Sequence, residues 1–136
     1  MKKNETSLTS LISAFGRAYH SKYDTPKIFD DFIAKDLITQ KEFADIRENM
    51  IKGIQFFNSK IAKKFQDHPD EILKWITQVQ LSPTPLARAA YCENVLFHEM
   101  LLGVNQYVIL GAGLDTFCFR HPELNDSIEI FEVDYP

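Results

Sequence analysis

Apolar residues in the first part of the chain recur every three or four positions, the spacing that places them on one face of a helix. Residues 7–20 follow this pattern and predict the first helix. Asp24-Thr25-Pro26 is typical of a helix start, and it predicts a second helix with its buried face in residues 28–37. Thr39-Gln40-Lys41-Glu42 has the pattern of a capping box and predicts a long helix that runs through residue 65.

Two further helices are predicted before residue 103. The first carries apolar residues between positions 72 and 79. Ser82-Pro83-Thr84-Pro85 then predicts a rigid, extended joint, because a residue before proline is disfavoured at helical backbone angles. Thr84 and Pro85 begin the next predicted helix, which runs to residue 102, and Gly103 is its predicted C-terminal cap. Residues 1–103 are therefore expected to form a helical cover.

The pattern changes after residue 103. Tyr107 to Leu110 form a short apolar run, typical of a strand buried on both faces in a parallel sheet. Gly111-Ala112-Gly113 follows and allows a tight turn with close approach of a ligand to the backbone. A second apolar run from Ile128 to Val133 predicts another strand, which ends at Asp134.

The spacing of Gly111 and Asp134 indicates a nucleotide cofactor. They are 23 positions apart, close to the roughly 20 residues between a nucleotide-binding glycine turn and the acid that binds the ribose. We therefore expect an α/β fold in which residues 104–136 begin a Rossmann-like domain. Such a sheet has about five or more strands, and two strands alone are not stable. We expect the sheet to be truncated here and completed by another polypeptide or by the rest of a protein about twice this length or more.

Composition and charge narrow the class of protein. The chain has 136 residues, of which 45% are hydrophobic and 25% charged, values ordinary for a soluble globular domain. From residue 101 onward there is one base, Arg120, against six acids, which argues against a nucleic-acid-binding face there. No apolar run approaches the roughly 18 residues of a membrane span, and the N-terminus lacks a secretory apolar region. We expect a cytoplasmic protein with no membrane partner.

No metal site is expected from the cysteines and histidines. Cys92 and Cys118 lie far apart without metal-ligand spacing and are predicted to be free thiols. The histidines have no such spacing with one another or with the cysteines. They are His20, His68, His98 and His121.

The glycine turn favours S-adenosylmethionine over a dinucleotide. The dinucleotide fingerprint needs a third glycine three residues after Gly113, and Thr116 occupies that position. S-adenosylmethionine has no phosphates. Its binding site needs backbone close to the amino-acid part, an acidic side chain for the ribose hydroxyls and a basic side chain for the ligand's own carboxylate. For Asp115, a role in capping the helix expected after Thr116 is at least as good an explanation as contact with the ligand. Glu132 alternates with Asp134 and could share its role.

Four segments together resemble a known family. L-G-A-G-L-D-T-F at residues 110–117 and F-E-V-D-Y-P at residues 131–136 resemble the leucine carboxyl methyltransferase family and its bacterial S-adenosylmethionine-dependent O-methyltransferase relatives. S-L-T-S-L-I-S-A-F-G-R-A at residues 7–18 and T-P-L-A-R-A-A-Y at residues 84–91 resemble that family's N-terminal helical cover. The resemblance covers most of the chain and implies a class I methyltransferase fold.

The resemblance implies S-adenosyl-L-methionine as the cofactor and assigns four residues to it. Arg88 matches the arginine that holds the methionine carboxylate, a role suited to a bidentate guanidinium. Gly111 matches the first glycine of the turn, and Gly113 gives close approach beside it. Asp134 matches the acid that accepts hydrogen bonds from the ribose hydroxyls.

The resemblance also implies what the whole enzyme does. Family members continue with an acidic-apolar pair that contacts the adenine and with the substrate pocket, so we expect the 136-residue chain alone to be inactive. Eukaryotic members carry a cofactor-contacting lysine near the N-terminus, and the region near Ser10 has none, which fits the bacterial branch. The expected methyl acceptor is a carboxylate or hydroxyl of a small molecule or protein, and no catalytic residue is identified.

Two other classes of function remain open on the sequence. A nicotinamide-dependent oxidoreductase could use the same glycine turn, with the missing third glycine counting against it. A non-catalytic helical interaction module could carry a vestigial sheet.

Overall fold

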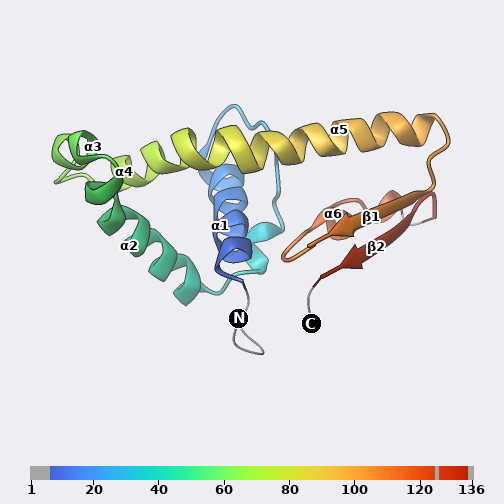
Figure 1. The fold of residues 1–136 in the computed structure, drawn as a ribbon, viewed down its shortest axis with the longest axis horizontal. Helices are drawn as coiled ribbons and strands as arrows, with labels where there is room; N and C mark the ends of the chain where they lie inside the picture. Colours follow the sequence, from blue (N-terminus) through green and yellow to red (C-terminus); the bar gives the residue numbers. More distant parts are fainter. Residues whose placement is uncertain (1–6, 125, 135–136) are drawn as a thin grey trace.

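The computed structural model of the chain describes residues 7–124 and 126–134. A long helical element made of α4, η2 and α5 runs along the molecule, with α2 and α3 at one end, α1 beneath its middle and a two-stranded parallel sheet at the other end (Figure 1). The elements in chain order are α1 Leu8–Tyr23, η1 Ala34–Asp36, α2 Gln40–Phe57, α3 Ser59–Lys64, α4 Pro69–Ile76, η2 Thr77–Leu86, α5 Ala87–Leu101, β1 Gln106–Leu110, α6 Phe117–Arg120, η3 Pro122–Leu124 and β2 Glu129–Val133.

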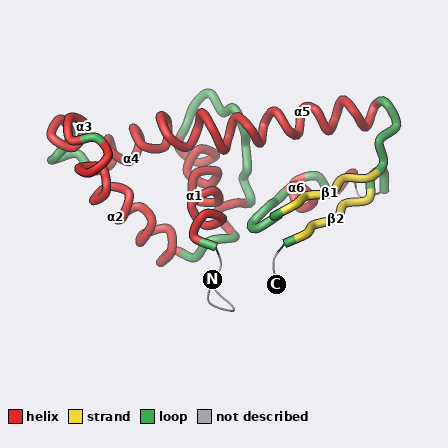
Figure 2. The backbone as a smooth tube through the Cα atoms, viewed as in Figure 1, coloured by secondary structure: helices red, strands yellow, loops and turns green. Residues whose placement is uncertain are grey.

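The chain is therefore an α/β protein, and several predicted boundaries are confirmed. The first helix is present as α1 and continues three residues beyond the prediction. Thr39 and Glu42 form the capping box, and α2 begins at Gln40, the residue after Thr39. Gly103 lies just beyond Leu102, the C-cap residue of α5, and its N–H donates to the carbonyl of Met100. Figure 2 shows helix in the first part of the chain and strand only near its end.

The helix predicted after Asp24-Thr25-Pro26 is wrong. Residues 24–33 form a loop, and only the single 3-10 turn η1 follows it. Backbone N–H groups that would bond within a helix donate to side chains instead. Ile28 N–H donates to His20 Nε2 at 3.0 Å, and Ala34 N–H donates to Asp31 Oδ1 at 3.0 Å. Local side-chain acceptors of this kind compete with the helical hydrogen bonds.

The long helix predicted through residue 65 is interrupted at Asn58. Asn58 has a non-helical backbone, with φ −151° and ψ 85°, and its side-chain Oδ1 accepts from Ile61 N–H at 3.2 Å. It therefore ends α2 and caps the N-terminus of α3, a role that asparagine fills well. The apolar stripe continues across the break, which is why spacing alone predicted one helix.

The extended joint predicted at residues 82–85 is also wrong. Residues 77–86 form the wide π-helical turns of η2, and α4, η2 and α5 follow one another without a gap. The Ser82 hydroxyl donates to the carbonyl of Thr77 at 3.0 Å, a further hydrogen bond in a segment whose two prolines have no N–H. Leu81 packs over Gly16 of α1, so tertiary contact holds this segment helical.

Among the described residues, the apolar core has three clusters of buried residues. The largest packs α1 against η1 and α2 around Phe15, which is fully buried. A second joins α2 and α4 through Ile54 and Ile76. A third lies between α5, α6 and the sheet; its buried members are Leu96, Phe117 and Ile128.

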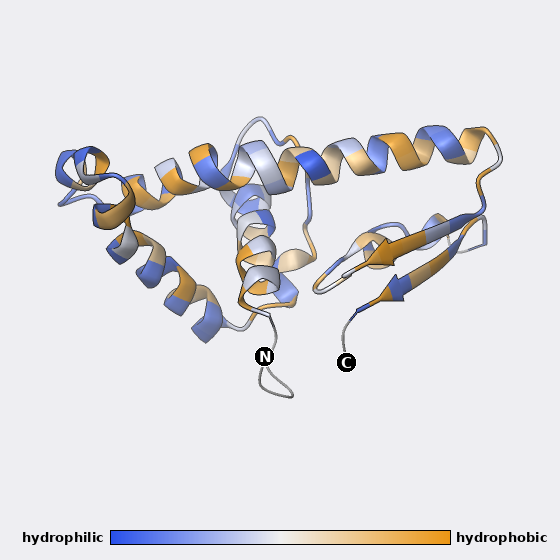
Figure 3. Cartoon of the chain, viewed as in Figure 1, coloured by the Kyte–Doolittle hydropathy of each residue, from blue (hydrophilic) through white to orange (hydrophobic). Residues whose placement is uncertain are grey.

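The sheet has one covered face and one exposed face. The parallel strands pair Val108 with Phe131 and Leu110 with Val133. These four side chains are 46% to 78% exposed, and Figure 3 shows hydrophobic colour along both strands. The prediction of a strand buried on both faces is therefore wrong for the residues described, because only one face packs against helices.

No helix in the described part of the chain is long and apolar enough to cross a membrane.

The Ile54 cluster generates a test of the fold. Ile54 is 3% exposed, so Ile54→Ala removes buried methyl groups and leaves a cavity. We expect it to lower the free energy of unfolding by about 3 kcal/mol. Val79→Ala is the control, because Val79 is half exposed, and we expect a change within about 0.5 kcal/mol. Urea unfolding measures both, and equal effects would contradict this assignment of the core.

Candidate functional site

The glycine turn follows β1 and is hydrogen-bonded to the carboxyl end of β2. Gly111 and Gly113 have φ values of +69° and +56°, in the left-handed region that glycine adopts without strain. Gly111 N–H donates to the carbonyl of Val133 at 2.7 Å. Gly113 N–H donates to Asp134 Oδ2 at 2.5 Å. The turn and the acid that follows the next strand are therefore in direct contact.

The first turn of α1 lies against the second glycine. A Cβ at Gly113 would lie 2.6 Å from Ser10 Oγ, closer than real Cβ atoms come to such neighbours. A Cβ at Gly111 would meet nothing within 4 Å among the described residues. Gly113 thus allows the helical cover to approach, and Gly111 leaves open space on the turn.

A groove runs between α1, the start of α5 and the loop after β1. It consists of two adjoining cavities of about 290 Å³ and 510 Å³, which we call the glycine-turn groove. The residues that line both cavities are Ser13, Arg17, Pro85, Ala89 and Asp115.

The predicted site residues lie in and beside this groove. Gly111 lines the smaller cavity, and Arg88 lines the larger one. Gly113 and Asp134 are paired at the turn itself. The structure thus brings the two glycines and Asp134 together and places Arg88 on the adjoining wall. Residues 135 and 136 of the predicted acidic motif lie outside the described residues.

A buried carboxylate joins the groove to the helical cover. Asp31 is fully buried and accepts a hydrogen bond from the Thr116 hydroxyl at 2.6 Å. Its oxygens lie 3.5 Å from Arg17 Nε and 3.7 Å from Arg120 Nε. Arg17 also donates to the carbonyl of Leu114. Residues from the loop, α1 and the segment after the glycine turn therefore meet at one acid.

The second arginine of this network is held by Glu93 of α5. Arg120 donates through both terminal nitrogens to the Glu93 carboxylate, and Phe29 packs on its guanidinium with the ring centroid at 4.7 Å. Burial alone would lower the pKa of Arg120, but the hydrogen bonds and charge of Glu93 outweigh it and raise that pKa. For Arg17, burial prevails over Asp31 and lowers the pKa. Glu93 and Asp31 balance the charge of the two arginines.

Other reactive groups near the groove are poorly suited to proton transfer. Burial and a contact with Cys92 raise the pKa of Tyr107, so its phenol stays protonated at neutral pH. Burial and Glu132 raise the pKa of the Cys118 thiol. Both cysteines are free, as predicted. Within residues 7–124 and 126–134, no three or more His, Cys, Asp or Glu side chains are grouped to hold a metal ion.

Asp115 has the capping role that its position predicted. Its Oδ1 accepts from Phe117 N–H at 2.7 Å at the start of α6. It also lines both cavities, so the cap lies on the wall of the groove.

Sequence reasoning missed the contribution of α1. Ser10, Ser13 and Arg17 are spaced by three and four residues, which puts them on one face of α1 and into the groove. The same spacing is usual for a solvent-facing stripe, so the pattern alone does not mark a site. Asp31 gave no signal, because its partner Thr116 is 85 positions away.

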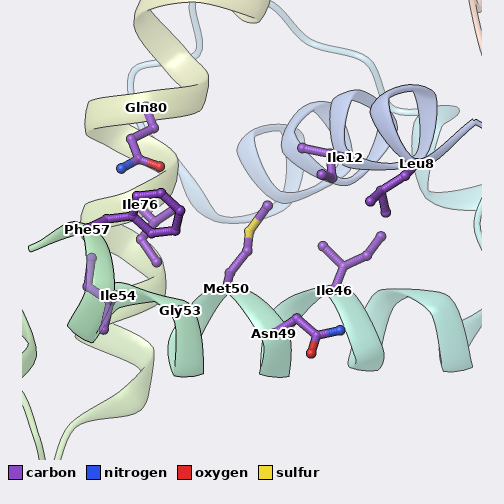
Figure 4. Close-up of a pocket in the computed structure, with 10 residues that line it drawn as sticks. All are labelled: Leu8, Ile12, Ile46, Asn49, Met50, Gly53, Ile54, Phe57, Ile76 and Gln80. Carbon is purple, nitrogen blue, oxygen red and sulfur yellow. The ribbon is translucent and has the colours of Figure 1, made fainter.

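A second, apolar cavity of about 370 Å³ lies between α1, α2 and the α4–η2 segment. Figure 4 shows Ile12 and Met50 directed toward each other from facing helices, with Asn49 and Gln80 as the polar lining residues. No charged residue lines it within the described chain. Its chemistry is that of a hydrophobic surface, unlike the glycine-turn groove.

Known proteins resemble this chain along its length. Residues 10–136 match the family "Leucine carboxyl methyltransferase". The "Putative S-adenosyl-L-methionine-dependent methyltransferase YktD" of Bacillus subtilis is 71% identical over all 136 residues. A Mycobacterium marinum protein named as an S-adenosyl-L-methionine-dependent methyltransferase is 26% identical over 128 residues, 94% of this chain.

The chain spans less than half the length of these curated relatives. It covers 45% of the Bacillus protein and 38% of the Mycobacterium protein. No solved structure matches the chain.

The buried network generates a prediction for stability. Asp31→Ala leaves the Arg17 guanidinium without its carboxylate in a buried place, so we expect the free energy of unfolding to fall by about 3 kcal/mol or more. Asp36→Ala is the matched control, because the Lys35–Asp36 pair is exposed on both sides, and we expect a loss below about 1 kcal/mol. Urea unfolding compares the two, and a small effect of Asp31→Ala would contradict the role given to this acid.

Proposed function

Because the chain belongs to the leucine carboxyl methyltransferase family, we propose that it forms one side of the cofactor site of an S-adenosyl-L-methionine-dependent O-methyltransferase. The contact between Gly113 N–H and Asp134 carries the proposal. It holds an acid beside a ligand-accessible backbone turn at the ends of two parallel strands. A carboxylate there can accept hydrogen bonds from both hydroxyls of a ribose.

The residues of the groove fit this cofactor. Open space over Gly111 admits the ligand to the backbone, and Asp134 would hold the ribose. Arg88, on the wall of the larger cavity, would bind the carboxylate of the methionine part. When bound, S-adenosyl-L-methionine supplies an activated methyl group on a sulfonium. The residues of this chain contribute by binding and orienting, which accelerates an in-line transfer through proximity.

The proposed acceptor is an oxygen of a carboxylate or a hydroxyl, on a small molecule or a protein. A carboxylate attacks without a base, whereas a hydroxyl needs one. Tyr107 lines the groove, but its raised pKa makes its phenol a poor base at neutral pH. A base for a hydroxyl acceptor would therefore come from elsewhere in the enzyme.

We assign residues 1–103 to a helical cover and residues 104–136 to the start of a Rossmann-like domain, whose sheet is completed by a further part of the same protein. The exposed apolar face supports this assignment, because Val108, Leu110, Phe131 and Val133 present a surface that water does not favour. The greater length of the relatives supports it too. The cofactor site would then be shared between this chain and that part.

The role of Asp134 is tested by titrating the natural protein that contains this chain with S-adenosyl-L-methionine in a calorimeter. We expect Asp134→Ala to weaken binding about 10-fold or more, because two hydrogen bonds to a charged group are lost. Glu129→Ala on the same strand is the control, since Glu129 pairs with Gln106 away from the turn, and should bind as the unsubstituted protein does. Preferential binding of a nicotinamide dinucleotide would instead favour an oxidoreductase.

The proposed sharing of the site predicts that residues 1–136 alone do not turn over. Transfer of a labelled methyl group from S-adenosyl-L-methionine to an acceptor preparation from cell extract measures this. We expect no transfer above background by the isolated chain and transfer by a protein that supplies the rest of the sheet. Turnover by the isolated chain would contradict the proposal.

A further inference from the structure

We propose that Arg17 of α1 binds the carboxylate of the ligand in the glycine-turn groove, as a second guanidinium beside Arg88. This inference rests on the proposed function, because it takes a ligand with an amino-acid carboxylate as the occupant. It adds the helical cover to the site, and it gives the buried Asp31 the task of holding a ligand-binding arginine in place.

The first observation is the position of Arg17. It lines both cavities of the groove, together with Ser13 one turn earlier on α1. Arg88 lines the larger of these cavities. Two guanidinium groups therefore border one space, one from α1 and one from α5, and a carboxylate between them can accept from both.

The second observation is an unused hydrogen-bond donor. The Arg17 side chain is nine-tenths buried, and its Nε has no hydrogen-bond partner among the described residues. Asp31 Oδ2 lies 3.5 Å from this nitrogen, which pairs the charge without forming a hydrogen bond. A buried donor left unsatisfied costs free energy, so such atoms in native proteins usually have a partner. In the proposed complex, an oxygen of the ligand carboxylate is that partner.

The third observation is that Arg17 is already fixed in place. It donates to the carbonyl of Leu114, and Asp31 lies behind it. Asp31 is in turn fixed by the Thr116 hydroxyl and by Ala34 N–H. A guanidinium held in this way loses little conformational entropy when the ligand binds. The ligand therefore binds more tightly than it would to a mobile arginine. Arg88 is exposed and has more freedom to lose.

The experiment compares two ligands that differ in the carboxylate. S-adenosylhomocysteine carries the amino-acid part, whereas 5′-methylthioadenosine keeps the adenosine and lacks that part. Calorimetric titration of the natural protein that contains this chain is repeated with Arg17→Lys, which keeps the charge and removes the planar fork. We expect Arg17→Lys to weaken S-adenosylhomocysteine binding roughly 10-fold and to leave methylthioadenosine binding unchanged.

Two controls separate this inference from the proposed function. Arg88→Lys should also act on S-adenosylhomocysteine alone, and Asp134→Ala should weaken both ligands, because both contain the ribose. If Asp134→Ala weakens both ligands and Arg17→Lys changes neither, the proposed function stands and the role of Arg17 is overturned. Equal weakening of both ligands by Arg17→Lys also overturns it, because that is the result of a structural role. Binding of neither ligand by the unsubstituted protein overturns both proposals.

A measurement on the unsubstituted protein keeps the test decisive if Arg17→Lys does not fold. The Nε–H signal of Arg17 in heteronuclear NMR spectra reports whether this atom gains a partner. We expect it to shift on addition of S-adenosylhomocysteine and to stay in place on addition of methylthioadenosine. An unchanged signal with bound S-adenosylhomocysteine would overturn the inference.

Discussion

The arrangement of the groove depends on the burial of one carboxylate. Asp31 is removed from water, and a charge in that position persists only when it is paired and hydrogen-bonded. Its partners come from three separate segments: Arg17 from α1, Ala34 from η1, and Thr116 from the chain after the glycine turn. Satisfying this one acid therefore fixes the helical cover relative to the turn.

The long helical element provides the second constraint on this placement. It runs from residue 69 to residue 101. It contacts α2 at one end, and at the other it contributes to the cluster of Leu96, Phe117 and Ile128 beside the sheet. Leu81 of its π-helical part packs on Gly16, and Glu93 of α5 holds Arg120. The groove lies where α1, this element and the glycine turn meet, so its walls are set by rigid elements more than by loops.

The sequence allowed the elements to be predicted wherever local chemistry decides them. The capping box at Thr39 and the strand before Gly111 could be predicted from nearby residues, and the spacing of Gly111 and Asp134 predicted that both belong to one site. The helical course of residues 82–85 could not, because packing on α1 and the Ser82 hydroxyl outweigh the backbone preference before proline.

The contacts that assemble the site were hidden for a different reason. Arg17 and Leu114 are 97 positions apart, and no periodic pattern reports which distant residue a polar side chain will meet. Ser13 and Arg17 have the spacing of an ordinary polar helix face. Only the folded arrangement distinguishes a face turned toward a groove from one turned toward water.

The division of the core into separate clusters has a thermodynamic consequence for any occupant of the groove. One wall of the groove comes from α1, which carries Phe15 of the first cluster, and another includes Phe117 of the third cluster. A molecule bound between them acts as a reversible cross-link, because it binds only while both clusters keep their native placement. By mass action, the ligand then stabilises the native arrangement of the two clusters, and this stabilisation grows with the logarithm of the ligand concentration.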